Sequence, residues 1–211
     1  MPQGVHASLS GIPWWTTDVG GYGCGSEQEN DTPYMKELVV RWYQFGCFSP
    51  IFRTHGHRKG ADEPNTATCH PAQSSGGPNE AWSYGDDTQE LLTFWISLRR
   101  KMKPYIAQLA ANVTATGVPT MRPLWYEFPD DPKCVGLNGQ YMLGPDLLIA
   151  PVTVQNATSK EVYFPAGSWI NLLDPTDKVT STGETKTVPA PITSIPVYCK
   201  GACPEMVETC K

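Results

Sequence analysis

The sequence lacks the features by which membrane-spanning and nucleic-acid-binding proteins are usually found. No stretch approaches the roughly 18 consecutive apolar residues of a transmembrane helix. The formal charge is −5 and lysine and arginine form no large cluster, whereas a nucleic-acid partner requires a basic surface. The longest basic run, at residues 99–103, has helical spacing and predicts a solvated helix face. We therefore expect no nucleic acid and no membrane among the partners.

Motifs of several other activities are also missing. There is no GxSxG motif and no phosphate-binding glycine loop. The seven cysteines include no CxxC pair, which argues against a zinc site. His55 and His57 have the spacing of a pair of metal ligands, but no third ligand is near them in the sequence. We expect neither a metal ion nor a cofactor.

The cysteines predict disulfides or buried thiols. The three near the end of the chain predict a disulfide-stabilised terminus, and the odd total leaves at least one cysteine free or paired outside the chain. Sequons for N-glycosylation occur at Asn30, Asn112 and Asn156. Like disulfides, N-glycans are added in the secretory pathway. Although the first residues lack the charged and apolar regions of a signal peptide, we expect a protein of the secretory pathway, secreted or lumenal. The cysteines are Cys24, Cys47, Cys69, Cys134, Cys199, Cys203 and Cys210.

The residues that are abundant indicate a folded protein with many turns. Glycine and proline together make up 39 of the 211 residues, 40% of residues are hydrophobic, and 22 are aromatic. This composition excludes a disordered chain and a coiled coil. The length allows one large or two small domains, and it falls short of the roughly 250 residues of a complete eight-stranded β/α barrel.

The first part of the chain predicts strands and helices in alternation. Residues 9–25 are an apolar and aromatic run that ends in a glycine cluster, which predicts a buried strand and its exit loop. Thr32 and Pro33 predict the start of a helix that Gly46 ends. A second apolar run at residues 47–58 predicts another strand.

A long polar loop is predicted at residues 57–83, which are rich in proline, glycine and serine. After it, apolar residues at helical spacing predict a long helix from Asp87, kinked at Pro104 and ended by Gly117. Residues 1–117 therefore correspond to two consecutive β/α units.

From residue 118 onward, short apolar segments alternate with proline, glycine, aspartate and asparagine, a pattern typical of an antiparallel β-sandwich. We assign residues 118–211 to this second domain, so the fold class is α/β followed by all-β. The strand-like segments are 120–128, 140–144, 146–154, 161–167, 168–173, 186–191 and 194–200.

Two polar residues follow the two predicted strands of the first domain. Asp18 precedes a glycine pair and Tyr22, and His55 follows Arg53. In β/α barrels the site is built at these strand ends. With Trp15 upstream, a carboxylate, an imidazole and aromatic rings suit a sugar, because sugar rings present both C–H faces and hydroxyls.

Each of these features also has a purely structural explanation. Asp18 before two glycines is equally consistent with a turn cap. Trp14 and Trp15 point to opposite faces of a strand, so at least one belongs to the core. The acidic pair Asp130-Asp131 lies between prolines and predicts a turn. From the residues alone, the pocket is one for a carbohydrate or another small polar molecule.

Long sequence blocks resemble glycoside hydrolase family 31, the α-glucosidases and α-xylosidases. The resemblance extends to about residue 200 and implies the last two β/α units of a (β/α)8 barrel, followed by an antiparallel β-sandwich. The blocks occur in the order SGIPWWTTDVGGY, KELVVRWYQFGCFSPIFRTHG, EAWSYG, LRRKMKPYI, PTMRPLWYEFPDDP, QYMLGPDLLIAPV, EVYFPAGSWINLL and APITSIPV.

The resemblance also implies roles for the residues at the strand ends. Asp18 corresponds to an aspartate that hydrogen-bonds sugar hydroxyls in the −1 subsite, and Tyr22 to an aromatic residue that lines this subsite. His55 corresponds to a histidine that donates to another hydroxyl of the same sugar. Trp15 matches an aromatic residue beside the pocket. We expect Arg53 to support His55, because polar groups near a site need partners.

The family's two catalytic carboxylates lie in blocks upstream of this segment, and neither block is present. We therefore assign no catalytic residue. The expected function is that of a fragment of a retaining α-glycosidase, which hydrolyses terminal α-linked glucose or xylose and is inactive as an isolated chain. Its partners are an oligosaccharide or glycoside substrate and the rest of the barrel. The alternatives are a non-catalytic carbohydrate-binding or regulatory module of the same family, and a gene-model fragment.

Overall fold

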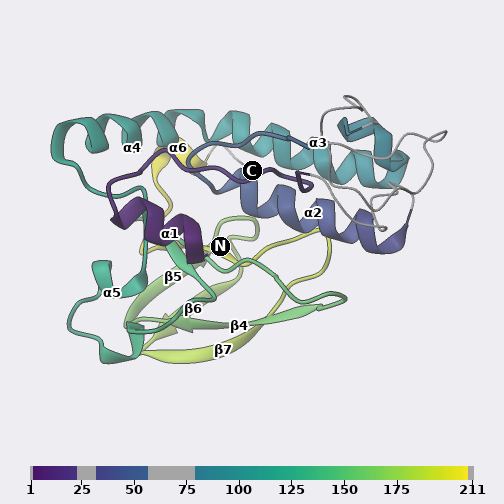
Figure 1. The fold of residues 1–211 in the computed structure, drawn as a ribbon. Helices are drawn as coiled ribbons and strands as arrows, with labels where there is room; N and C mark the ends of the chain where they lie inside the picture. Colours follow the sequence, from purple (N-terminus) through teal and green to yellow (C-terminus); the bar gives the residue numbers. More distant parts are fainter. Residues whose placement is uncertain (1, 23–31, 57–78, 209–211) are drawn as a thin grey trace.

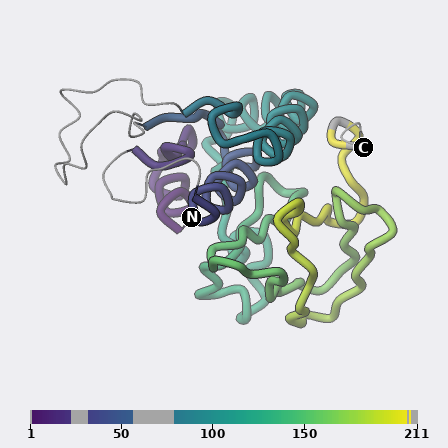
Figure 2. Tube along the Cα trace, turned by 90° about the vertical axis from the view of Figure 1, so that its right-hand side faces the viewer, coloured from purple at the N-terminus to yellow at the C-terminus, as the bar shows by residue number. Residues whose placement is uncertain are grey.

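The computed structural model describes residues 2–22, 32–56 and 79–208 and shows a helical layer above antiparallel sheets (Figure 1). Turned by 90°, the same layers are seen with the helices above the green and yellow strands (Figure 2). The helices are α1 (Pro2–Leu9), α2 (Pro33–Cys47), η1 (Ala81–Tyr84), α3 (Asp86–Lys101), α4 (Lys103–Thr116), α5 (Leu124–Glu127), η2 (Pro132–Cys134) and α6 (Glu205–Glu208). The strands are β1 (Met121–Arg122), β2 (Tyr141–Leu143), β3 (Leu147–Ile149), β4 (Ser159–Phe164), β5 (Gly167–Asn171), β6 (Lys178–Ser181), β7 (Glu184–Pro189) and β8 (Val197–Lys200).

Helix α2 begins as predicted and ends one residue later than predicted. The Thr32 hydroxyl accepts a hydrogen bond from the Met35 amide at 3.2 Å, which caps the helix. Gly46 lies inside the last turn and does not stop the helix. A Cβ atom there would be 2.7 Å from the Phe52 ring and 3.0 Å from the Val19 side chain. The glycine therefore lets one segment before the helix and one after it pack against the helix.

The predicted long helix is two helices joined at Met102. The Met102 amide still donates to the Leu98 carbonyl at 3.0 Å. Pro104 lies in the first turn of α4, where its missing N–H breaks no helical hydrogen bond. Gly117 adopts a left-handed conformation at φ 73° and ends α4 as predicted.

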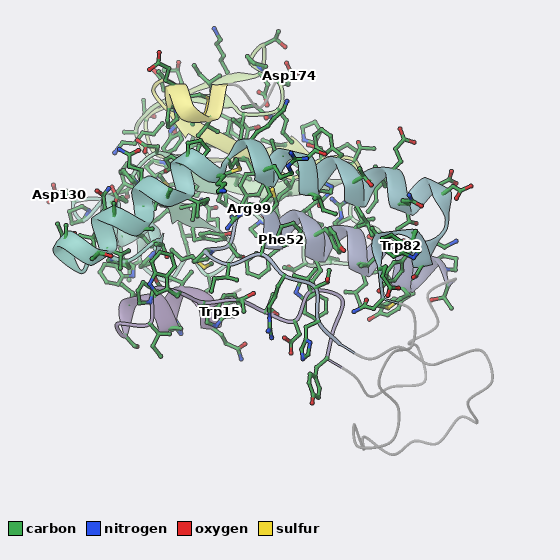
Figure 3. The ribbon with its side chains drawn as sticks, turned by 90° about the horizontal axis from the view of Figure 1, so that it is seen from above. Trp15, Phe52, Trp82, Arg99, Asp130 and Asp174 are labelled. Carbon is green, nitrogen blue, oxygen red and sulfur yellow. A yellow bond between two sulfur atoms is a disulfide. The ribbon has the colours of Figure 1, made fainter. Side chains whose placement is uncertain are left out.

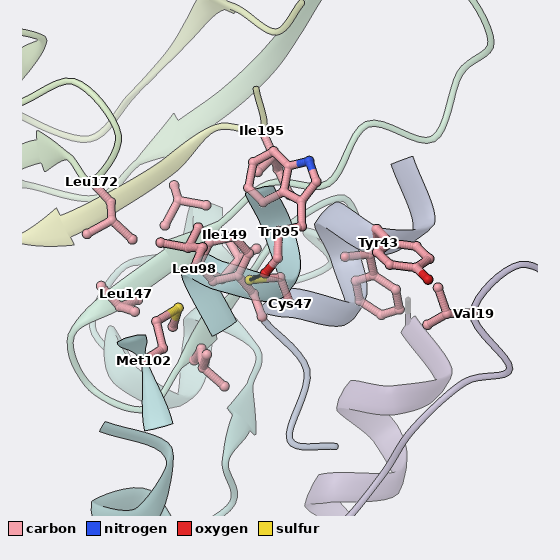
Figure 4. Close-up of a cluster of buried hydrophobic side chains, with 14 of the residues drawn as sticks. Val19, Tyr43, Cys47, Trp95, Leu98, Met102, Leu147, Ile149, Leu172 and Ile195 are labelled. Carbon is pink, nitrogen blue, oxygen red and sulfur yellow. Dashed lines mark hydrogen bonds between the residues drawn. The ribbon is translucent and has the colours of Figure 1, made fainter. Parts of the chain in front are cut away.

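The central sheet has six strands in the order β1-β2-β3-β8-β5-β6, and β4 and β7 form a second sheet on its other face. All the strand pairs are antiparallel. Leu147 and Ile149 face the helices and pack in one core with Trp95 (Figure 4). Leu148, between them, packs on the opposite face with Tyr198. Because both faces are buried, these strands are continuously apolar.

The helical layer is fixed to the β-domain, which we define as residues 118–208, by buried polar contacts as well as by the shared core. Arg41 on α2 is buried, and this burial lowers the pKa of its guanidinium. Gln44, one turn later, donates to the Ile192 carbonyl at 2.7 Å. Arg41 donates to the carbonyls of Ala157, Ala190, Pro191 and Ser194 at 2.8 to 3.0 Å.

The strand prediction is wrong in two places of the β-domain. After β1, residues 124–127 form the short helix α5, because Pro123 ends the extended segment, and Trp125 and Tyr126 are exposed. Strand β6 was not predicted, because its sequence KVTS is mostly polar and only Val179 and Ser181 are buried.

The two strands predicted in the first part of the chain are also wrong as regular strands. Over the described residues they are extended segments joined by a single parallel bridge between Val19 and Thr54. Parallel pairing is the arrangement expected of consecutive barrel strands. Helix α1 was not predicted and precedes the first of these segments.

The described cysteines bear out part of the prediction. Cys199 and Cys203 form a disulfide near the end of the chain, and Cys47 and Cys134 are buried cysteines outside any disulfide. Of the sequons, Asn112 and Asn156 are exposed. Among the described helices, none is both long and apolar enough to cross a bilayer. Cys24, Cys69, Cys210 and Asn30 lie outside the described residues.

Candidate sugar-binding site

A tight turn follows the first extended segment and positions Asp18. The Gly21 amide donates to the Asp18 carbonyl at 2.7 Å. Gly20 and Gly21 have φ values of 94° and 92°, which side-chain-bearing residues rarely adopt. The glycine pair thus turns the chain immediately after the carboxylate.

The second segment touches this turn backbone to backbone. A Cβ atom at Gly56 would lie 1.9 Å from the Gly21 carbonyl oxygen, and Gly56 has a φ of 131°. Only glycine allows this approach. It brings the residues next to Gly56 and Gly21, His55 and Tyr22, to the same end of the molecule, where their ring centroids are 5.5 Å apart.

Arg53 pairs with Asp18 instead of His55. Its Nη2 atom donates to Asp18 Oδ1 at 2.7 Å, and the two side chains are 50% and 29% exposed. At this exposure the pair contributes at most about 1 kcal/mol to stability. Its effect is to orient the carboxylate. No hydrogen bond joins Arg53 to His55 within the described residues.

Tyr22 and His55 lie at the surface of the described part of the chain. Both are exposed, and neither the phenol nor the imidazole makes a hydrogen bond to another described residue. The phenol and imidazole can donate or accept hydrogen bonds, and the Asp18 carboxylate accepts them. Together with the aromatic faces, they match the mixed polar and apolar surface of a sugar.

The two tryptophans separate as their positions on an extended segment predict. Trp14 is 44% exposed. Trp15 is partly buried, lies 6.1 Å from the Phe45 ring and fills the space that a Cβ atom at Gly4 would need. Figure 3 shows Trp15 beside α1. Its packing fixes the segment between α1 and α2, and contact with a sugar stays a prediction for this residue.

Arg99 on α3 holds the start of the second segment, residues 47–50, by hydrogen bonds. Its guanidinium donates to the carbonyls of Cys47, Ser49 and Pro50 at 2.8, 2.6 and 2.7 Å. Burial lowers the pKa of this group. The prediction of a solvated face for residues 99–103 is therefore wrong at Arg99, because a basic run does not show which member turns inward.

A third group of contacts supports Gly56 from the far end of the predicted loop. The Asn79 side chain donates to the Gly56 carbonyl at 3.3 Å. Asn79 is held in turn by the hydroxyl of Tyr84, which donates to its side-chain oxygen at 2.5 Å. Tyr84 is buried. Sequence analysis did not find these residues, because they lie in or directly after the polar stretch of residues 57–83, which has no periodic pattern.

The site therefore holds a carboxylate, a phenol and an imidazole on two touching loops. No group of three histidine, cysteine, aspartate or glutamate side chains within the described part of the chain is arranged to hold a metal ion. The arrangement can bind hydroxyl groups and pack against a sugar face.

Two family models match the sequence. The model described as "Glycosyl hydrolases family 31 TIM-barrel domain" matches residues 1–109, and the one described as "Glycosyl hydrolase family 31 C-terminal domain" matches residues 117–202. The chain belongs to glycosyl hydrolase family 31. Its fold is part of a family 31 barrel followed by the family's C-terminal β-domain, as the sequence blocks predict.

Several similar proteins bear the names of glycosidases. The chain is 39% identical over 166 residues to an α-xylosidase of Saccharolobus solfataricus, covering 79% of this chain and 20% of the relative. It is 29% identical over 203 residues to α-glucosidase 2 of Bacillus thermoamyloliquefaciens, covering 95% and 22%. The crystal structure of a family 31 α-xylosidase from a soil metagenome, complexed with xylose, superimposes with a TM-score of 0.86 at 36% identity, covering 98% and 30%. The chain thus spans less than a third of the length of each of these three proteins.

Proposed function

We propose that this chain is the C-terminal portion of a retaining α-glycosidase that hydrolyses terminal α-linked glucose or xylose from oligosaccharides. The observation that carries the proposal is the convergence of Asp18, Tyr22 and His55 on two touching loops. The relatives support the choice of sugar, because they bear the names α-xylosidase and α-glucosidase.

Each residue has a distinct role in the proposed −1 subsite. Asp18 accepts hydrogen bonds from two sugar hydroxyls while Arg53 holds its carboxylate in one orientation. His55 donates to a further hydroxyl of the same ring. Tyr22 packs against the apolar face of the sugar, and Trp15 forms the wall behind the loop.

The chemical step requires groups from the rest of the barrel. A retaining glycosidase uses a nucleophile and an acid/base, two carboxyl groups about 5 Å apart. The chain has neither sequence block that carries them in this family, and it spans 20% to 30% of its relatives. We propose that both carboxylates belong to a preceding part of the barrel, and that these 211 residues alone do not hydrolyse glycosides.

We propose that the preceding part of the barrel also packs against apolar side chains that this chain leaves exposed. Ile12, Trp14 and Ile51 are 58%, 44% and 39% exposed on the two segments that share the parallel bridge. In a closed barrel, neighbouring β/α units cover such apolar side chains.

The proposed location is the secretory pathway. Two observations support it: the Cys199–Cys203 disulfide, which forms in oxidising compartments, and the exposure of Asn112 and Asn156 in their sequons.

Sequencing the transcript upstream of the Met1 codon tests the proposal. We expect an in-frame block that encodes the two missing carboxylates, and a longer protein that hydrolyses aryl α-glucosides or α-xylosides. In that protein, Asp18→Ala should lower kcat/KM by about 100-fold or more, since it removes charge-assisted hydrogen bonds to the sugar. Asp174→Ala, an exposed aspartate on the β-domain, is the matched control (Figure 3).

An upstream stop codon, together with saturable sugar binding by the 211-residue chain that requires Asp18, would instead establish the alternative of a non-catalytic binding module. A full-length barrel whose activity is unaffected by Asp18→Ala would contradict the proposed −1 subsite.

A further inference from the structure

A second concave site lies on the β-domain and shares no lining residue with the candidate −1 subsite. Its volume is about 490 Å³, within the usual range of small-molecule sites. Three segments form it: residues 127–133, which run from the end of α5 into η2, the turn at 165–166 between β4 and β5, and the turn at 182–183 between β6 and β7. Asp130, between α5 and η2, lies at the edge of the molecule (Figure 3).

The walls of this pocket are fixed by hydrogen bonds between the segments. The hydroxyl of Tyr163 on β4 donates to Asp131 Oδ2 at 2.5 Å, and this bond lowers the pKa of the Asp131 carboxyl. The Lys133 amide donates to Asp131 Oδ1 at 3.0 Å. Lys133 Nζ donates to the Gly183 carbonyl at 2.8 Å and joins the first segment to the third. The pocket is therefore formed before any ligand binds.

One wall is apolar and rigid. The Phe128 ring packs 6.0 Å from Trp169, and Lys200 Nζ lies 4.7 Å from its centroid. The rest of this wall consists of Pro129, Pro132, Pro165 and Ala166. These groups have few conformations to lose when a ligand binds.

Two polar groups in the pocket have no partner within the described residues. The exposed Asp130 carboxylate makes no hydrogen bond or ion pair there, and neither does the Thr182 hydroxyl. Lys133 Nζ uses one of its three donors on Gly183. Glu127, by contrast, is already paired with Arg122.

We propose that this pocket is a second carbohydrate-binding site, which takes one pyranose ring of an oligosaccharide. The apolar wall packs against the C–H face of the ring, while Asp130 and Thr182 bind its hydroxyls and Lys133 donates to another ring oxygen. The choice of a sugar as ligand rests on the proposed function of the chain.

The pocket chemistry disfavours other ligand classes. A wholly apolar ligand would bury Asp130 and Thr182 without partners. An anionic ligand would meet the carboxylates of Asp130 and Asp131, and a cationic ligand would meet Lys133. A neutral ligand that is rich in hydroxyls satisfies all of these groups.

Titration of the ¹⁵N-labelled 211-residue chain with maltotriose, and separately with xylose, tests the site. The amides of Ala166, Thr182 and Gly183 should shift saturably at sugar concentrations up to about 50 mM. Asp130→Ala should weaken binding about tenfold and Thr182→Val about threefold, from the loss of one charged and one neutral hydrogen bond. Both residues are exposed, so the variants should remain folded.

Glu161→Gln is the matched control, because Glu161 is an exposed carboxylate on β4 outside the pocket. Absence of shifts at the pocket amides with either sugar would overturn the proposal, as would shifts that Asp130→Ala and Thr182→Val leave unchanged. Loss of the site in the longer protein encoded by the transcript would also overturn it, and would assign the pocket to a contact with the rest of the chain.

The amides of Gly20, Gly21 and Gly56 report on the −1 subsite in the same spectra. Shifts at the pocket without shifts at these glycines support the second site whatever the outcome for the −1 subsite. Transcript sequencing and kinetics of the longer protein test the proposed function separately, so the two proposals can fail independently.

Discussion

The central sheet and the candidate −1 subsite differ in how completely other parts of this chain pack against them. The sheet is covered on both faces, by α2, α3 and α4 on one side and by β4 and β7 on the other. The two segments that carry Asp18 and His55 share one parallel bridge, and they expose large apolar side chains, with Ile12 at 58% and Trp14 at 44%. We therefore expect the central sheet to contribute most of the free energy of unfolding, and the segments of the proposed −1 subsite to contribute little.

This difference has a physical cause. An antiparallel sheet with short hairpin connections forms from contiguous sequence, so the β-domain can be completed within one chain segment. A barrel strand needs a neighbour on each edge. The first extended segment has one such neighbour within the described residues, the segment that carries Thr54.

The largest expected effect on the free energy of unfolding is at the core between the helices and the central sheet. Trp95→Ala removes a side chain that is fully buried between the helices and the sheet, so it should lower the free energy of unfolding by about 3–5 kcal/mol. Trp14→Ala, on the exposed segment, should lower it by less than about 1 kcal/mol. Urea denaturation of the two variants measures both values, and equal losses would show that the two regions are not distinct in packing.

A smaller effect is expected where the two regions meet. Arg99→Met removes three hydrogen bonds to carbonyls between α2 and the second segment. It should lower the free energy of unfolding by about 2–3 kcal/mol and speed amide exchange at residues 52–56. Arg100→Met, at the exposed neighbouring position, is the control. Unchanged exchange at 52–56 in Arg99→Met would argue that the segment is held by packing alone.

The smallest effect on global stability, and the most local one, is expected at the contact between the two loops. Gly56→Ala places a methyl group against the Gly21 carbonyl and should separate the loops. We expect a loss of about 1 kcal/mol, with amide shifts confined to residues 18–22 and 53–56. Gly139→Ala, where the added Cβ would meet only the tip of Lys160 at 3.4 Å, should leave these amides unchanged. Shifts that spread into the central sheet would show that the loops and the core are coupled.

The same contrast explains how much of the fold the sequence predicts. Helix α2, the end of α4 at Gly117 and most of the β-domain strands follow from local patterns of caps, periodicity and turn residues. The strands at 9–25 and 47–58 were predicted from apolar content, which shows that a segment is extended but not that it has partners on both edges. Strand β6 is not predicted, because its sequence is mostly polar. It becomes a strand by pairing with β5, and this pairing cannot be read from the local sequence.

The site was predictable in its members and not in its contacts. The sequence blocks pick out Asp18, Tyr22 and His55, and the structure brings them to one end of the molecule. The pairing of Arg53 with Asp18, and the support from Arg99 and Asn79, depend on contacts across 23 to 52 residues of sequence. No local pattern encodes such contacts.

The central claim is that this chain holds sugar-binding groups of a family 31 glycosidase without its chemistry. The most direct test is to incubate the purified 211-residue chain with 4-nitrophenyl α-D-xyloside and 4-nitrophenyl α-D-glucoside and to measure nitrophenol release. We predict a rate equal to that of buffer alone. Release above this rate that disappears in Asp18→Asn would contradict the account, because it would place a complete active site within these residues.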